Sequence, residues 1–171
     1  MAASACLPRD YDALPTILGP GEVHRYVEEL LDFARRNGTW GQEVAEALHD
    51  LIATRLSDTY SVLAPDLSDR VFDEVEANWS TDSMDYVDAL CSVLVNITAD
   101  TTPFFQQRLE IEQDERVKAI LEECRDLAAA GAQEILELRA RLGHQVPPFD
   151  HQASWPPGPY PRSGRIPQSP A

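Results

Sequence analysis

The sequence predicts an all-α protein built from antiparallel helical hairpins, with a long C-terminal helix and an extended Pro-rich tail. Residues 114–143 place apolar side chains at alternating spacings of four and three, which is the period of one helix face. Several shorter segments before them have helical spacing and are separated by short loops. No segment shows the strict alternation of a half-buried strand. The hairpins could stack as an array or pack as an irregular bundle.

The composition divides the chain into three parts. Residues 1–20 contain three prolines and no periodicity, so we expect an N-terminal arm that packs Leu14, Ile17 and Leu18 on the first helices. Residues 21–144 should form a single all-helical domain. Residues 145–171 hold eight of the thirteen prolines and should be extended. The tail could lie on the helical body or dock to another protein.

The first hairpin is expected between residues 21 and 56. A helix over 21–37 should end at Asn37 and Gly38, because glycine readily adopts the left-handed conformation after a helix. Thr39 and Gln42 have the spacing of a capping box for a second helix that continues to Leu56.

The next helices are expected at 66–79, 82–97 and 103–111. Ser80 or Thr81 should cap the second of these, and the pair Thr102 and Pro103 should open the third. Residues 86–97 are the most apolar segment, so their helix should be the most buried. Ile111 is read as one of the apolar anchors of the 103–111 helix.

The long helix has recognisable ends. Asp114 can cap its first turn, and Gly143 can stop it before the prolines of the tail. Its apolar seam comprises Val117, Leu121, Cys124, Ala128, Gly131, Ile135, Leu138 and Leu142. Gly131 could divide the segment into two helices, or it could let another helix cross closely. A single helix is favoured because the seam continues through it.

One segment has the features of a known repeat. Residues 96–129, NITADTTPFFQQRLEIEQDERVKAILEECRDLAA, have a loop with an Asp, a Pro at a helix start, an acidic break and a Val-x-x-x-Leu face. This segment resembles a HEAT-type helical repeat. The resemblance implies a short HEAT-like α-solenoid and a protein-binding role, with an irregular helical bundle as the alternative.

The net charge restricts the partners. There are 29 acidic and 14 basic residues, for a net charge of -15, so anionic membranes and nucleic acid should be repelled. No apolar run is long enough to span a membrane and no signal peptide is seen, so a cytoplasmic location is expected. Three widely spaced cysteines suggest buried free thiols in a reducing compartment. In size, charge and helical content the chain is similar to small acidic bacterial immunity proteins.

The densest charge lies between residues 66 and 88, where eight acidic residues accompany Arg70 alone. Like charges at helical spacings destabilise a helix, so a docking face for a basic protein is one interpretation and a solvated helix face is the other. The candidate partner-binding residues are Asp66, Asp69, Asp73, Glu76, Asp82 and Asp85, with Trp155 and Tyr160 of the tail. Trp40 is a further candidate anchor, equally compatible with internal packing.

No motif for catalysis, a metal or a cofactor is found, so a non-enzymatic protein without a cofactor is expected. Three hypotheses follow, the third being an enzyme whose active-site residues are not close together in the sequence. The first is an immunity or inhibitor protein that neutralises a toxin through the acidic face, and the second is a structural adaptor that docks through its Pro-rich tail. The sequence does not decide between a monomer and a homo-oligomer.

Overall fold

The computed structural model describes residues 7–38, 40–56 and 61–143, and the fold is all-α over these residues. The helices are α1 (Pro20–Asn37), α2 (Gln42–His49), the π-helix η1 (Asp50–Leu56), α3 (Pro65–Ala77), α4 (Met84–Asn96), α5 (Thr102–Ile111) and α6 (Glu115–Gly143). No strand occurs among the described residues. The all-α prediction and the long C-terminal helix are therefore confirmed.

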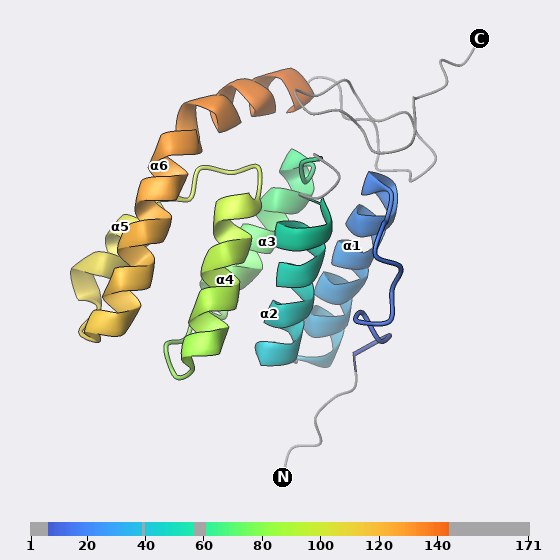
Figure 1. The fold of residues 1–171 in the computed structure, drawn as a ribbon, viewed down its shortest axis with the longest axis horizontal. Coiled ribbons are helices and arrows are strands. Elements are labelled where there is room, and N and C mark those ends of the chain that lie inside the picture. The colour runs from blue at the N-terminus through green and yellow to red at the C-terminus, as the bar shows by residue number, and fades with distance from the viewer. Residues whose placement is uncertain (1–6, 39, 57–60, 144–171) are drawn as a thin grey trace.

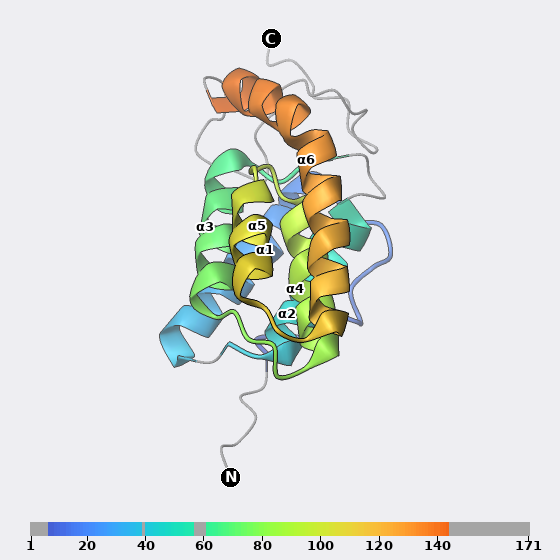
Figure 2. The ribbon, with the colours of Figure 1, turned by 90° about the vertical axis from the view of Figure 1, so that its left-hand side faces the viewer.

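The helices form two layers. Figures 1 and 2 show α1, α3 and α5 on one side and α2, α4 and α6 on the other. Within the layers α1 packs on α3, α2 on α4 and α4 on α6, while α1 with α2 and α5 with α6 join the layers. The helix α4 therefore lies in the middle of its layer, between α2 and α6.

The core follows the predicted apolar stripes. Val27 and Leu30 of α1, Leu48 of α2 and Leu90 and Leu94 of α4 are all 0% exposed. Burying one such side chain stabilises the fold by roughly 1.5–3 kcal/mol. Seven of the thirteen residues of α4 are buried, which agrees with the expectation that this helix is the most buried.

The helix α6 is continuous, and Asp114 caps it by accepting a hydrogen bond from the Arg116 N–H at 2.9 Å. Six of the eight predicted seam residues are buried, the exceptions being Gly131 and Ile135. A side chain at Gly131 would meet only Ile135 of the same helix at 3.9 Å, so the idea of a close helix crossing there is wrong. In Figure 1, α6 bends away from α4 and α5 to cover one end of the body.

The N-caps of the helices are the least accurately predicted features of the fold. Gly41 is the N-cap of α2, and the Gln42 side chain donates to Glu46 of the same helix, while Thr39, the other predicted capping residue, lies outside the described residues. The cap of α4 is Ser83, whose hydroxyl accepts from the Tyr86 N–H at 3.4 Å, rather than Ser80 or Thr81. Thr101, rather than Thr102, is the N-cap of α5, whereas Pro103 lies in the first turn of this helix as predicted.

The described part of the N-terminal arm packs on α1 and η1. Leu18 is 2% exposed as expected, whereas Ile17 is 79% exposed, so its predicted packing is wrong. The exposed Arg9 and the buried Tyr11 both donate hydrogen bonds to Glu29 of α1, at 2.6 and 2.9 Å. The wider π-helical turn brings Arg55 beside Asp50 at 2.7 Å, and the same guanidinium donates to backbone carbonyls of the arm.

No helix of the described residues combines the length and hydropathy required to cross a bilayer.

Candidate functional site

The predicted acidic residues lie on α3, on the loop that follows it and on the first turn of α4. Asp66, Asp73 and Glu76 are exposed on α3, Asp82 is exposed on the loop, and Asp85 is exposed on α4. The apolar residues Leu67, Val71 and Val75 of α3 are buried. The three and four spacing thus separates a core-facing stripe from a charged solvent face, as the sequence predicted.

Asp69 differs from the other candidates. Both of its carboxylate oxygens accept hydrogen bonds from Arg139 of α6 at 2.8 Å, and the same guanidinium also donates to the Thr98 carbonyl at 2.7 Å. The hydrogen bond with Asp69 raises the pKa of the Arg139 guanidinium above its ordinary value. This bidentate pair joins α6 to α3, so Asp69 is neutralised within the chain and its assignment as a partner-binding residue is not supported.

Arg70, the one basic residue of the 66–88 segment, also pairs with carboxylates of the same chain. Arg70 donates to Asp32 of α1 at 2.9 Å and lies 3.8 Å from Glu28. It therefore neutralises carboxylates of α1 rather than those of its own helix.

The remaining carboxylates have no such partner. Asp66, Asp73, Glu76, Asp82 and Asp85 form no ion pair with any described lysine or arginine. Asp66 still acts on Arg139 at longer range and adds to the rise of that pKa. We call these five residues the acidic surface. Its five carboxylates are negative charges that remain available to a partner.

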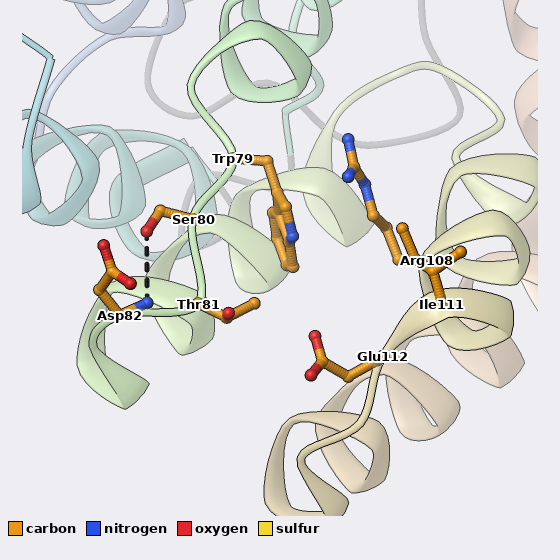
Figure 3. Close-up of a pocket in the computed structure, with 7 residues that line it drawn as sticks. All are labelled: Trp79, Ser80, Thr81, Asp82, Arg108, Ile111 and Glu112. Carbon is orange, nitrogen blue, oxygen red and sulfur yellow. Dashed lines mark hydrogen bonds between the residues drawn. The ribbon is translucent and has the colours of Figure 1, made fainter.

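A groove opens beside the acidic surface. It is lined by Trp79, Ser80, Thr81 and Asp82 of the α3–α4 loop and by Arg108, Ile111 and Glu112 at the end of α5, and its volume is ≈ 350 Å³. Figure 3 shows the Trp79 indole, Thr81 and the Glu112 carboxylate facing the space between the two elements. We call it the Trp79 groove, and it shares Asp82 with the acidic surface.

The wall of the groove is fixed by aromatic rings that pack edge to face. Phe104 of α5 makes edge contacts with Trp79 at 5.3 Å and with Phe72 at 5.9 Å between ring centroids. The Arg108 guanidinium lies 5.2 Å from the Phe104 centroid and 5.8 Å from that of Trp79. These contacts are cation–π and edge-to-face geometries, which hold Trp79 in place while leaving it half-exposed.

The α5 side of the groove combines an apolar and an anionic group. Ile111 is 66% exposed, so its predicted role as an apolar anchor of α5 is wrong. It lies in the last turn of the helix, beyond the buried Phe104 and Phe105. The Oε1 atom of Glu112 accepts from the backbone N–H groups of Gln113 and Asp114, each at 2.9 Å, which fixes the carboxylate at the end of α5.

The other aromatic candidates do not join this site. Trp40 donates from its indole nitrogen to the Tyr86 hydroxyl at 2.7 Å and packs against the core, so it is an internal residue rather than an interface anchor. Trp155 and Tyr160 lie outside the described residues. The groove was not predicted, since Trp79, Arg108, Ile111 and Glu112 are separated by up to 33 positions of the numbering.

The described residues offer little other chemistry. No group of three His, Cys, Asp or Glu side chains among them could hold a metal ion. The buried thiols of Cys91 on α4 and Cys124 on α6 hydrogen-bond to each other, which raises the pKa of Cys91 and lowers that of Cys124. These two thiols are thus buried between two helices, as predicted, and Cys6 lies outside the described residues.

Comparison of the chain with protein-family models, with curated proteins and with solved structures finds no match. The geometry of the acidic surface and of the Trp79 groove is therefore the basis for a functional interpretation.

Proposed function

We propose that this protein is a non-enzymatic binding protein that holds a basic protein through its acidic surface. The observation that carries the proposal is the contrast between Asp69, which α6 neutralises, and its neighbours Asp73 and Glu76, which form no ion pair with a described base. The Asp69 carboxylate stabilises the fold through its ion pair with a basic residue of the same chain. Those that are exposed and form no ion pair with a described base are available to a cationic partner.

The energetics favour the same interpretation. Asp73 and Glu76 are three positions apart on α3, and like charges at this spacing cost a few tenths of a kcal/mol. A basic partner relieves this repulsion on binding. The field of a protein with net charge -15 also steers a cationic protein towards it and accelerates association.

The finer proposal is a toxin-neutralising immunity or inhibitor protein of HEAT-like or irregular helical architecture. Its support is the small size, the strong acidity and the two layers of successive helical hairpins (Figure 1). An array of hairpins presents a rigid surface for binding another protein. The acidic surface would then cover a basic region of the toxin.

A pair of matched variants tests the proposal. Asp73→Lys with Glu76→Lys reverses two carboxylates of the acidic surface, whereas Glu122→Lys with Glu123→Lys makes the same change of charge on exposed positions of α6. Each variant and the wild type are used to capture proteins from a lysate of the source cells, and the captured proteins are identified by mass spectrometry. We expect a basic protein that the wild type and the α6 variant retain and the α3 variant loses.

Equal losses with the two variants would mean that net charge alone attracts the captured proteins. Equal retention with both would mean that the acidic surface takes no part. Either result contradicts the proposal.

A further inference from the structure

We propose that the Trp79 groove is the apolar anchor point of this interface and receives an aliphatic side chain that is flanked by lysine or arginine in the partner. This inference rests on the proposed function, because it assigns the part of the interface that supplies affinity beyond charge. Exposed ion pairs contribute little to a complex, whereas a side chain inserted beside a tryptophan commonly contributes much.

The shape and rigidity of the groove fit such an anchor. Its volume of ≈ 350 Å³ lies near the lower end of the roughly 300–1,000 Å³ typical of ligand pockets. Trp79 is held by its edge contact with Phe104 at 5.3 Å, so binding does not have to order it. The exposed Ile111 supplies an aliphatic surface on the opposite side (Figure 3).

The charges around the groove select the residues that flank the anchor. Arg108 lies over the rings of Trp79 and Phe104 and forms no ion pair with Glu112. The Glu112 carboxylate faces the groove and is held by two backbone N–H groups, so it is a fixed anion at one side. Asp82 belongs to both the groove and the acidic surface. The Arg108 guanidinium points away from Glu112 and Asp82 in Figure 3, so a basic residue next to the inserted side chain would meet a carboxylate on that side of the groove.

Nuclear magnetic resonance titration with short peptides tests the assignment. The full-length protein is titrated with Ac-Lys-Leu-Arg-Lys-NH₂, with a peptide in which glycine replaces leucine, and with an acidic peptide in which glutamates replace the three basic residues. We expect the leucine peptide to shift the indole N–H signal of Trp79 and the amides around Ile111. The glycine peptide should shift amides of the acidic surface and leave the indole signal unchanged.

Two variants locate the contact. Ile111→Ser should weaken binding of the leucine peptide about tenfold, since it removes most of the aliphatic surface. Leu127→Ser is the matched control, because Leu127 is 55% exposed on α6 and lies outside the groove. We expect it to leave the affinity unchanged. Both positions are on the surface, so both variants should fold.

The outcomes separate this inference from the function on which it rests. If the leucine and glycine peptides shift the Trp79 signal equally, or if Ile111→Ser has no effect, the groove is not the anchor point, while binding of basic peptides to the acidic surface still supports the proposed function. If the acidic peptide binds as tightly as the basic ones, both proposals are wrong. A Trp79 signal that shifts with protein concentration alone would assign the groove to a second copy of this chain.

Discussion

Removing the hydroxyl group of Tyr86 is a small change that tests how the helices pack. Its hydroxyl accepts a hydrogen bond from the Trp40 indole at 2.7 Å and donates one to the Asn78 carbonyl at 2.7 Å. It thus connects the α1–α2 loop, the end of α3 and the start of α4. Tyr86 is 7% exposed, and burial raises the pKa of its phenol. Replacing Tyr86 by phenylalanine removes one oxygen atom and keeps the ring.

The expected loss of stability follows from the two hydrogen bonds of the Tyr86 hydroxyl. A typical hydrogen bond contributes about 1 kcal/mol net, and a buried group left without a partner costs about 1–3 kcal/mol. Trp40 and Asn78 are only half-buried, so water can reach them after the change and the lower figure applies to each. We expect Tyr86→Phe to lower the free energy of unfolding by about 2 kcal/mol, or the melting temperature by about 4–8 °C for a chain of this size.

Urea denaturation followed by circular dichroism measures this loss. Tyr26→Phe is the matched control: Tyr26 is also buried, at 8% exposed, but its hydroxyl receives only a 3.3 Å bond from Arg25. That control should cost less than about 0.5 kcal/mol. If Tyr86→Phe costs no more than the control, the hydroxyl does not join the three segments and this account of the packing is wrong.

Three further predictions concern other elements. Gly38 has φ 58°, so Gly38→Ala should cost about 1 kcal/mol in urea denaturation, and no loss would contradict the left-handed helix end. Hydrogen bonding from Arg9 lowers the pKa of Glu29, so this carboxylate stabilises the fold above its unfolded pKa of about 4.3 and the gain disappears as pH falls through the folded value. Between about pH 5 and 3 the wild type should lose more stability than Glu29→Gln, and parallel curves would refute this. Arg139→Ala should release α6 from Asp69, cost about 0.5–1 kcal/mol and speed amide hydrogen exchange in the last turns of α6; unchanged exchange would contradict the contact.

The helices could be predicted because the side chains that a helix buries recur at its period of 3.6 residues, and this spacing is visible in a single sequence. The seam from Val117 to Leu142 identified α6, and the apolar run around Leu90 identified the central α4. The caps could not be fixed in the same way. Ser80, Thr81 and Ser83 are all suitable capping residues near one boundary, and tertiary packing decides which of them becomes the N-cap.

The acidic surface was visible in the sequence because its members are close along the chain. The neutralisation of Asp69 was not, since Arg139 is 70 residues away and reaches it only through the bend of α6 across the body (Figure 1). The Trp79 groove was missed for the same reason. One side comes from the α3–α4 loop and the other from the end of α5, and Ile111 has the apolar character of a core residue without being buried.

The salt dependence of complex formation tests the central claim most directly. The affinity of the captured basic partner is measured by calorimetry at about 50 and about 300 mM salt, with the whole chain and with residues 145–171 deleted. Because exposed charges are screened over about 10 Å at 0.1 M salt, we expect binding to weaken about tenfold or more at the higher concentration and to survive the deletion. If the affinity is the same at both salt concentrations and is lost when residues 145–171 are deleted, the claim is contradicted and binding is assigned to the Pro-rich tail.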